Sequence, residues 1–378
     1  MIYLDNAATT PIHPDVLEAM QPFLTNQYGN PSSTYRLGRQ AKHGIERARD
    51  RLADWLGCHA DELVFTSGGT ESIQSALLGT ILSKGPRRHI VTAASEHHAV
   101  LHTCAWLESL GATVTVVQPD RYGRVHPEAV RSALRADTLL VPVQGVNNEL
   151  GTVQPVADIT RTVKDHLPAI VVHSDLVQTL GTRRLNLATS ELDLASFSAH
   201  KVSGPKGTGA LYVRRGTPWH SVLRGGAQER DRRAGTENVA GVVGFGAAVE
   251  RLARDWSTHL GQLERVRAAF VDSLQGLDGL LFNSPEDAVP AILNVAFAGV
   301  HNDTLLMRLD MEDVAASAGS ACAAGSLQPS HVLLAAGLPE EQVRASVRFS
   351  FSDLNTEVEV RRAGVIVADV VRSLGAHR

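Results

Sequence analysis

Short apolar runs and amphipathic stretches alternate along the chain from about residue 62 to residue 215. The apolar runs are bounded by turn residues and predict strands at 62–66, 89–93, 113–117, 138–143, 169–173, 193–197 and 209–213. Helical spacing predicts helices at 99–110, 127–135 and 155–167, and a longer upstream helix marked by Ala41, Ile45, Ala48, Leu52 and Leu56. Because strands alternate with helices, we expect an α/β domain with a mostly parallel sheet.

The pattern changes after residue 246, where helices become longer and strands fewer. One long amphipathic helix is marked by Leu260, Leu263, Val266, Phe270, Leu274 and Leu277. Strands are predicted near 292–297 and 347–351, followed by a last helix over 358–374. We therefore expect a large domain over 14–255 and a smaller α+β domain formed by 1–13 and 256–378, which carries the segment around Cys322.

Composition narrows the class of protein. The 378 residues have a formal net charge of −4 and are 43% hydrophobic, which suits a folded core and gives no electrostatic reason for a nucleic-acid partner. No apolar run approaches the length of about 18 residues that a membrane span needs, and the N-terminus lacks the pattern of a secretory signal. Three widely spaced cysteines, Cys58, Cys104 and Cys322, make no disulfide framework. We expect a soluble cytoplasmic enzyme without a membrane partner.

Two segments suggest an anion site and a reactive amine. The run TSGGTE at 66–71 follows a predicted strand and opens a helix, which suits a phosphate as well as it suits an ordinary capped turn. Ser198, His200 and Lys201 end another apolar strand, and a strand would project Ser198 and His200 to one side. Lys201 is either a desolvated amine or a lysine that extends to solvent.

Other polar residues also follow predicted strands. Asp175 and Gln178 come after 169–173, where ligands bind in open α/β sheets, although Asp175 could equally cap the next segment. The run NNE at 147–149 has the composition of a turn. Cys322 lies among Ala, Ser and Gly, which predicts an accessible loop suited to a nucleophilic thiol or a segment that packs tightly. The His98 and His102 pair lacks the motif of a zinc helix, so we expect no metal site there.

Taken together, these segments resemble the cysteine desulfurases over essentially the whole chain. The matching motifs are YLDNAATT at 3–10, GNPSS at 29–33, TSGGTES at 66–72, Glu96-His97, NNE at 147–149, Asp175 with Gln178, Ser198 with His200 and Lys201, RAGTEN at 233–238, SAC at 320–322, and Arg348 with Ser350 and Asn355-Thr356. The segment around Cys322 resembles the NifS/IscS-like branch. Departures from the family pattern stand at Tyr35, Ile73-Gln74, Gln144-Gly145 and Ser352-Asp353.

The resemblance implies a homodimeric pyridoxal-phosphate (PLP) enzyme of fold type I in the class V aminotransferase group. It has a large, mostly parallel α/β/α domain and a smaller α+β domain. Lys201 would bind PLP covalently, and Asp175 would pair with the protonated pyridine nitrogen. His97 would stack on the ring and move protons, while Gln178 and Asn147 would hydrogen-bond the ring oxygen.

The resemblance also implies which residues hold the phosphate and the substrate. The phosphate would be held by Gly69, Thr70, Ser198 and His200, with Thr236 reaching it from the partner subunit. Arg348, with Asn30, would grip a substrate carboxylate. Strand alternation places Arg348 and Ser350 on the side opposite Val347 and Phe349.

The implied activity is desulfuration of L-cysteine, which gives L-alanine and a persulfide on Cys322 for transfer to an acceptor. The acceptor would be a protein such as an iron–sulfur scaffold or a tRNA-thiolation protein, and Cys322 could serve as a transient iron–sulfur ligand. The alternatives are a selenocysteine lyase or a class V aminotransferase with the same cofactor. A non-catalytic scaffold would be expected to lack Lys201 or Cys322, and both are present.

Overall fold

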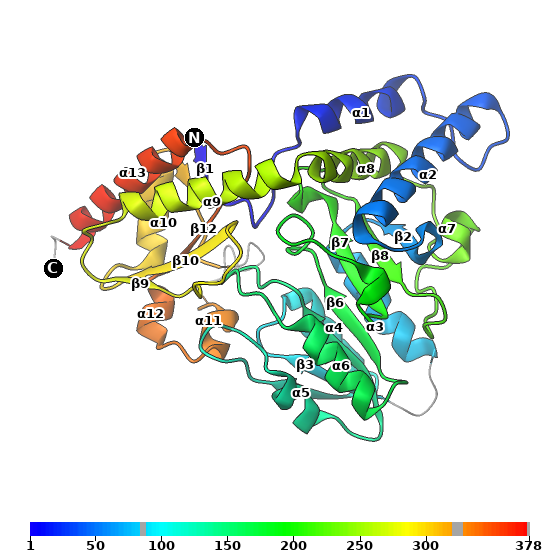
Figure 1. Ribbon diagram of the computed structural model, residues 1–378, viewed down its shortest axis with the longest axis horizontal. Helices are drawn as coiled ribbons and strands as arrows, with labels where there is room; N and C mark the ends of the chain where they lie inside the picture. The colour runs from blue at the N-terminus through cyan, green and yellow to red at the C-terminus, as the bar shows by residue number, and fades with distance from the viewer. Residues whose placement is uncertain (84–87, 320–327, 376–378) are drawn as a thin grey trace.

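The computed structural model describes residues 1–83, 88–319 and 328–375. A seven-stranded sheet forms the centre of the larger part of the molecule (Figure 1). Its spatial order is β2 (Leu63–Thr66), β8 (Gly209–Val213), β7 (Leu194–Ser198), β6 (Val171–Asp175), β5 (Thr138–Gln144), β3 (His89–Ala93) and β4 (Thr113–Val117). Strand β8 runs antiparallel to both neighbours, and the other strand pairs are parallel. The predicted mostly parallel sheet is therefore confirmed.

Helices cover both faces of this sheet because successive strand residues point to opposite sides. Val64, Ile90 and Leu211 join the core under α3 (Gly69–Ser83) and α4 (His98–Ser109). Phe65, Val91 and Tyr212 join the opposite core. The helices that contribute to that second core are α1 (Pro14–Thr25), α2 (Arg36–Leu56), α5 (Pro127–Ala133), α6 (Val156–His166) and α8 (Val239–Arg254). The short α7 (Gln228–Asp231) lies at the periphery in Figure 1.

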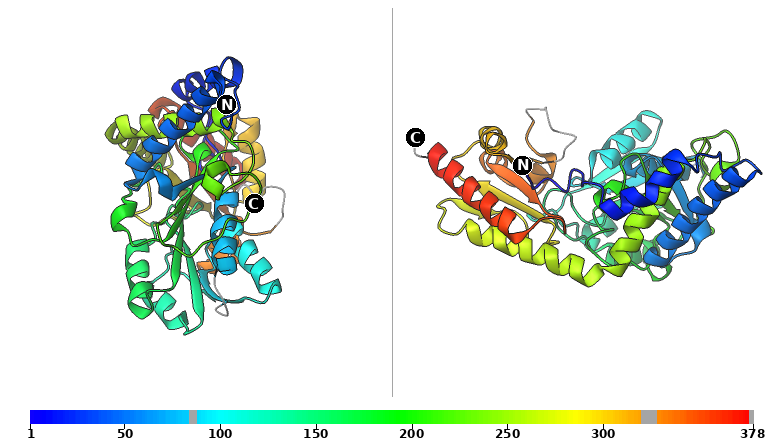
Figure 2. Two further views of the ribbon diagram at one scale, coloured as in Figure 1. Left: turned by 90° about the vertical axis from the view of Figure 1, so that its right-hand side faces the viewer. Right: turned by 90° about the horizontal axis from the view of Figure 1, so that it is seen from above.

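The remaining part of the molecule is built on an antiparallel sheet with the order β12 (Ser346–Ser350), β10 (Ile292–Phe297) and β9 (Leu280–Phe282). Its core is shared with three helices, α9 (Trp256–Ser273), α10 (Asn302–Met311) and α13 (Glu357–Gly375). Two short helices, α11 (His331–Ala335) and α12 (Glu340–Arg344), and the pair β1 (Ile2–Tyr3) with β11 (Val314–Ala315) complete it. Figure 2 shows that this part and the larger part lie end to end.

The predicted amphipathic stripe of the long helix faces this core, with Leu263, Val266, Phe270 and Leu274 all buried. Helix α9 itself ends at Ser273, so Leu274 and Leu277 pack from the turn that follows, which corrects the expected length of the helix. Asp255 is the residue between α8 and α9, at the boundary predicted from the sequence. The division into two domains stays a prediction. Within the described ranges, no helix is long and apolar enough to cross a membrane.

Candidate active site

Three neighbouring strands deliver polar side chains to one cavity of about 190 Å³. Gln144, Asp175 and Ser198 are the last residues of β5, β6 and β7, and all three line this cavity. Ligands bind at the carboxyl ends of strands in open α/β sheets, where loops diverge. The sheet therefore positions a site at the edge that the sequence analysis singled out.

One end of the cavity is formed by groups that suit an anion. Helix α3 begins at Gly69, and Gly69 and Thr70 line the cavity with Ser198 and His200. The N-terminus of a helix presents free N–H groups and a positive dipole end. Gly69 lies close to the loop after β6, since an added Cβ would sit 2.9 Å from Val177 Cγ2. A side chain at this position would push the helix away from the site.

Lys201 ends a short 3₁₀ turn, Ala199–Lys201, that directly follows β7. The strand stops at Ser198, so Ser198 and His200 are not on one strand face as predicted, although both line the cavity. The Lys201 ammonium donates hydrogen bonds to the carbonyl oxygens of Ala7 and of Ala8, the latter at 2.8 Å. Lys201 is therefore held inside the site and does not extend to solvent.

Asp175 is a buried carboxylate, only 8% exposed. Its Oδ1 accepts a hydrogen bond from the Val177 backbone N–H at 3.0 Å. Burial raises the pKa of Asp175 to about 6, against the opposing effects of the Val177 N–H and the Lys201 charge. A cationic N–H ligand beside this carboxylate would offset the cost of its burial.

His97 caps the first turn of α4 from inside the cavity. Its Nδ1 accepts a hydrogen bond from the Ala99 N–H at 3.0 Å, so the neutral ring carries its proton on Nε2. Burial lowers the pKa of His97 to about 4, and the Lys201 charge and neighbouring histidines act in the same direction. The imidazole is therefore neutral near pH 7.

The predicted role of Asn147 at the ring oxygen stays a prediction, and the structure uses its side chain within a turn. Its Oδ1 accepts hydrogen bonds from the N–H groups of Glu149 and Leu150, and its Nδ2 donates to the Ser95 carbonyl. Asn147 is fully buried and does not line the cavity, whereas Asn148 does. The available signal was that the first Asn of a tight turn tends to bond the backbone two residues on.

Gln178 and Arg348 reach the cavity from opposite parts of the molecule. The Gln178 amide donates to the Ala7 carbonyl at 2.9 Å. Arg348, on β12, is fully buried, and its Nη2 lies 2.7 Å from Asp5 Oδ1. Val347 and Phe349 point the other way into the core, as strand alternation predicts.

Some predicted residues lie elsewhere. The Asn30 side chain accepts from the Ser32 N–H at an exposed turn, and Thr236 is exposed; neither lines this cavity. Cys322 lies outside the described residues. Sequence reasoning also missed Gln144 and Asn148 as cavity residues, although it flagged Gln144 as a departure from the family pattern. Among the residues described, no group of three or more His, Cys, Asp or Glu side chains could hold a metal ion.

The side chains present fit pyridoxal phosphate. A helix N-terminus with hydroxyl and imidazole groups suits the phosphate, Lys201 supplies an amine, and Asp175 supplies a buried carboxylate for a ring N–H. Arg348 supplies a separate cation on the small-sheet side of the cavity.

Comparison with known proteins shows the family of the chain. Residues 2–363 match the family described as Aminotransferase class-V. The chain belongs to this family. A class-V relative from Bacillus subtilis (strain 168), "Putative cysteine desulfurase IscS 1", is 44% identical over 99% of both chains. "Cysteine desulfurase IscS" from Methanosarcina thermophila is 42% identical over 99% of this chain and 92% of the relative.

The fold of this class-V chain also matches solved structures. A structure described as "NIFS-LIKE PROTEIN" superposes with a TM-score of 0.92 at 37% sequence identity, covering 99% of both chains. Coverage of this extent includes both the seven-stranded sheet and the small antiparallel sheet. The expected fold type I architecture is confirmed.

Proposed function

We propose that this chain is a PLP-dependent cysteine desulfurase that takes sulfur from L-cysteine and holds it as a persulfide on Cys322. The desulfurase assignment rests on full-length relatives of that activity at 42% and 44% identity. PLP follows from the family and is supported by the fit of the cavity to the cofactor. L-cysteine and the enzyme thiol give L-alanine and the enzyme persulfide, which balances in atoms and charge.

When bound, PLP supplies an electron sink that eases bond breaking next to the substrate amino group. Lys201 would bind the cofactor, and Asp175 would pair with its ring nitrogen and keep it protonated. Gly69 and Thr70 at the start of α3, together with Ser198 and His200, would hold its phosphate. Arg348 holds the substrate carboxylate inside the protein, where water competes little for the guanidinium.

His97 and Asn148 act on the cofactor ring in this proposal. Neutral His97, whose Nδ1 is bonded to the Ala99 N–H, would stack on the ring and direct its Nε2–H toward the reacting groups. Asn148, which lines the cavity where Asn147 does not, would hydrogen-bond the ring oxygen together with Gln178.

Replacement of each cysteine in turn tests the nucleophile. The thiols of Cys58 and Cys104 are poor candidates, because burial raises the pKa of each to about 12. We expect Cys322→Ser to bind PLP and release neither alanine nor sulfide, whereas Cys58→Ser and Cys104→Ser turn over. Turnover by Cys322→Ser at the wild-type rate would disprove the persulfide mechanism.

We further propose that the enzyme is a homodimer that delivers sulfur to a protein acceptor in the cytoplasm. The exposed Thr236, which does not line the cavity of its own chain, suits a role at the partner subunit's phosphate. A persulfide mechanism needs a reduced thiol, which is typical of the cytoplasm. An iron–sulfur scaffold or a tRNA-thiolation protein is the expected class of acceptor, and capture of the acceptor by a persulfide-loaded enzyme is the test.

A further inference from the structure

The short segment from Asp5 to Ala8 connects two charged side chains of the site. At one end, Asp5 Oδ1 lies 2.7 Å from Arg348 Nη2. Two and three residues later, the carbonyl oxygens of Ala7 and Ala8 accept hydrogen bonds from the Lys201 ammonium. The residue proposed to hold the substrate and the residue proposed to hold the cofactor therefore share one stretch of backbone.

Hydrogen bonds hold this segment along its length. The Tyr3 hydroxyl donates to the Asp5 carbonyl at 3.0 Å and lies 2.9 Å from the Thr9 carbonyl, which bridges the segment. Burial raises the pKa of Tyr3, and Asp5 adds to this, so the phenol stays a neutral donor. The Ala7 N–H donates to Ser350 Oγ at 2.8 Å, on the same strand as Arg348.

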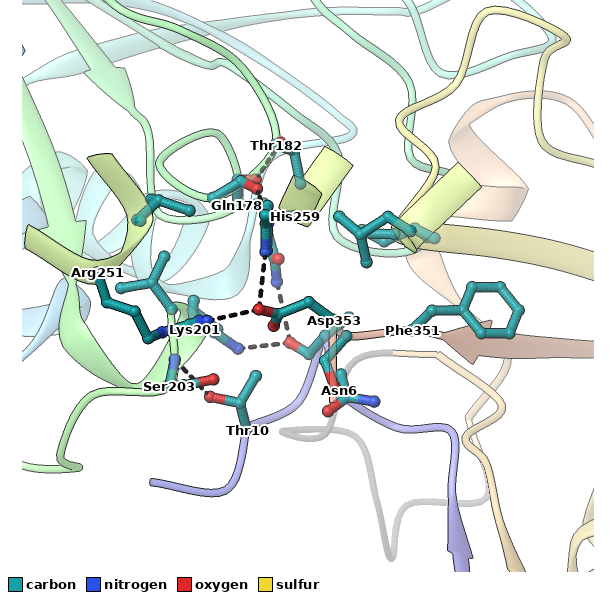
Figure 3. A pocket seen from close by; sticks show the side chains of 18 residues that line it. Asn6, Thr10, Gln178, Thr182, Lys201, Ser203, Arg251, His259, Phe351 and Asp353 are labelled. Atoms are coloured by element: carbon teal, nitrogen blue, oxygen red, sulfur yellow. Dashed lines mark hydrogen bonds and ion pairs between the residues drawn. The ribbon is translucent and has the colours of Figure 1, made fainter. Parts of the chain in front are cut away.

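The far side of the segment is fixed as well. Thr10 Oγ1 donates a hydrogen bond to the carbonyl of His200, the residue before Lys201, at 2.9 Å. The same oxygen accepts a hydrogen bond from the N–H of Ser203, two residues after Lys201. Figure 3 shows Thr10 joined to Ser203, and Lys201 reaching toward the segment that Asn6 and Thr10 mark. Hydrogen bonds therefore hold the backbone on both sides of the Ala7 and Ala8 carbonyls.

Asp5 also determines how Arg348 faces the cavity. Arg348 Nη1 donates to the Asn148 carbonyl at 2.9 Å, and Nη2 is bound by Asp5. Its buried Nε–H has no partner among the described residues, so the guanidinium keeps donor capacity for a ligand. Because Nη1 and Nη2 are both held, the plane of the Arg348 guanidinium is fixed. Bidentate recognition of a carboxylate requires such a fixed orientation.

We propose that Asp5 is a positioning residue that orients Arg348 for the substrate carboxylate and, through the segment to Ala8, couples Arg348 to the Lys201 amine. This inference rests on the proposed function for the identity of the substrate. An arriving carboxylate shares the guanidinium with Asp5 and weakens their pair.

Carboxylate recognition is tested with Asp5→Asn and Asp5→Ala in the PLP-loaded enzyme. We expect Asp5→Ala to raise the KM for L-cysteine about tenfold with kcat little changed, and Asp5→Asn to raise it less, since the amide keeps an acceptor. Inhibition by L-alanine should weaken in parallel, whereas inhibition by L-alaninamide, which lacks the carboxylate, should not change. Asp369→Asn, at an exposed ion pair with Arg372, is the matched control. If the Asp5 variants weakened inhibition by L-alanine and by L-alaninamide equally, or left the KM for L-cysteine unchanged, Asp5 would not orient Arg348.

The coupling is tested in the cofactor-free protein by reductive methylation of lysines and mass spectrometry. If Asp5→Ala weakens the hydrogen bonds from the Lys201 ammonium to the Ala7 and Ala8 carbonyls, the ammonium form is stabilised less. Labelling of Lys201 should therefore rise severalfold in this variant. It should also rise in Tyr3→Phe, which removes only the bridging hydroxyl, while the exposed Lys206 serves as internal reference. Unchanged Lys201 labelling in both variants would rule out the coupling. This readout needs no turnover, so it stands even if the wild-type enzyme proves not to desulfurate cysteine.

Discussion

Arg251 on α8 and Asp353 in the turn after β12 form a buried ion pair, with 2.6 Å between Nη1 and Oδ2. His259 on α9 lies against the same carboxylate, with its Nδ1 3.3 Å from Asp353 Oδ2 (Figure 3). The three side chains line a second cavity, which also touches Lys201. They tie the turn after the small sheet to the helices that link the two parts of the molecule, behind the active site.

Replacement of Asp353 by Asn should destabilise the protein by about 3 kcal/mol at pH 7, because Arg251 would stay buried without its counter-charge. Burial alone would raise the pKa of Asp353, but the neighbouring His259 and the hydrogen-bonded Arg251 outweigh it and hold the pKa far below its usual range. A depressed pKa gives stability that is present above the unfolded-state value and is lost as the pH falls. The part of the difference from wild type that comes from the Asp353 charge should therefore narrow as the pH falls below about 4.

Urea unfolding of both proteins across this range measures the difference. The exposed pair of Asp369 with Arg372 is the control, and Asp369→Asn should change the free energy of unfolding by less than about 1 kcal/mol. A loss in Asp353→Asn no larger than in the control would show that the buried pair adds no stability.

Lys201, and not Lys206, is predicted to carry the cofactor. The Lys201 amine lies in the cavity, whereas Lys206 is exposed beyond it. Borohydride reduction of the PLP-loaded enzyme followed by peptide mapping should place the pyridoxyl group on Lys201. Lys206→Met should retain the cofactor, and Lys201→Met should not bind it covalently. A labelled Lys206 peptide would contradict the assignment.

The central strands show why the sequence analysis located the site but placed the ends of the strands that form it too early. Strands were predicted to end at residues 143, 173 and 197, yet they end at Gln144, Asp175 and Ser198. These polar residues are buried in strand conformation because they face the cavity. A pattern of apolar positions stops where functional polar residues begin, so strands that build a site are read as too short.

Strands without site residues were predicted better. The bounds of β8 and β10, Gly209–Val213 and Ile292–Phe297, agree with the sequence prediction, since hydrophobic residues fill both strands almost throughout. The pair of Asp5 with Arg348 spans 343 residues of sequence, and the roles within NNE depend on turn geometry. The local pattern of apolar and polar residues encodes neither the Asp5–Arg348 pair nor the roles of the two asparagines. Only the structure shows them.

Asn147 and Asn148 should therefore respond differently to replacement by Ala. Asn147→Ala removes the acceptor for two buried N–H groups and should destabilise the fold by about 1–3 kcal/mol. Asn148→Ala should leave stability nearly unchanged, weaken PLP binding and shift the absorbance of the bound cofactor. Thermal unfolding of the cofactor-free proteins and PLP titration separate the two effects. If Asn147→Ala weakened PLP binding and Asn148→Ala destabilised the fold instead, Asn147 would be the residue that bonds the cofactor ring.

Subunit association should be required for full cofactor affinity. Thr236 is exposed and does not line the cavity of its own chain, so in the proposed dimer it completes the phosphate site of the partner subunit. Sedimentation should show that the protein is a dimer. The Thr236→Ala variant should bind PLP more weakly and should remain a dimer. A monomer that binds PLP fully and turns over cysteine would refute the shared site.

The pH profile of the enzyme should show that His97 is neutral over the working range. Burial lowers the pKa of His97 to about 4, and Nδ1 is committed to the Ala99 N–H, so the ring proton sits on Nε2. His97→Gln keeps an N–H donor of similar reach but cannot relay a proton, and we expect alanine formation to fall by about 10²–10⁴-fold. Loss of the cap on α4 should cost only about 1 kcal/mol of stability, so the variant stays folded and binds PLP.

Alanine formation measured from pH 4.5 to 8 provides the decisive comparison. Because His97 protonates only near pH 4, the wild-type activity should show no acid limb near pH 6.5, where an ordinary histidine titrates. An acid limb at pH 6–7 that disappears in His97→Gln would mean that the bound cofactor restores an ordinary pKa to His97. The neutral-imidazole role proposed here would then be wrong.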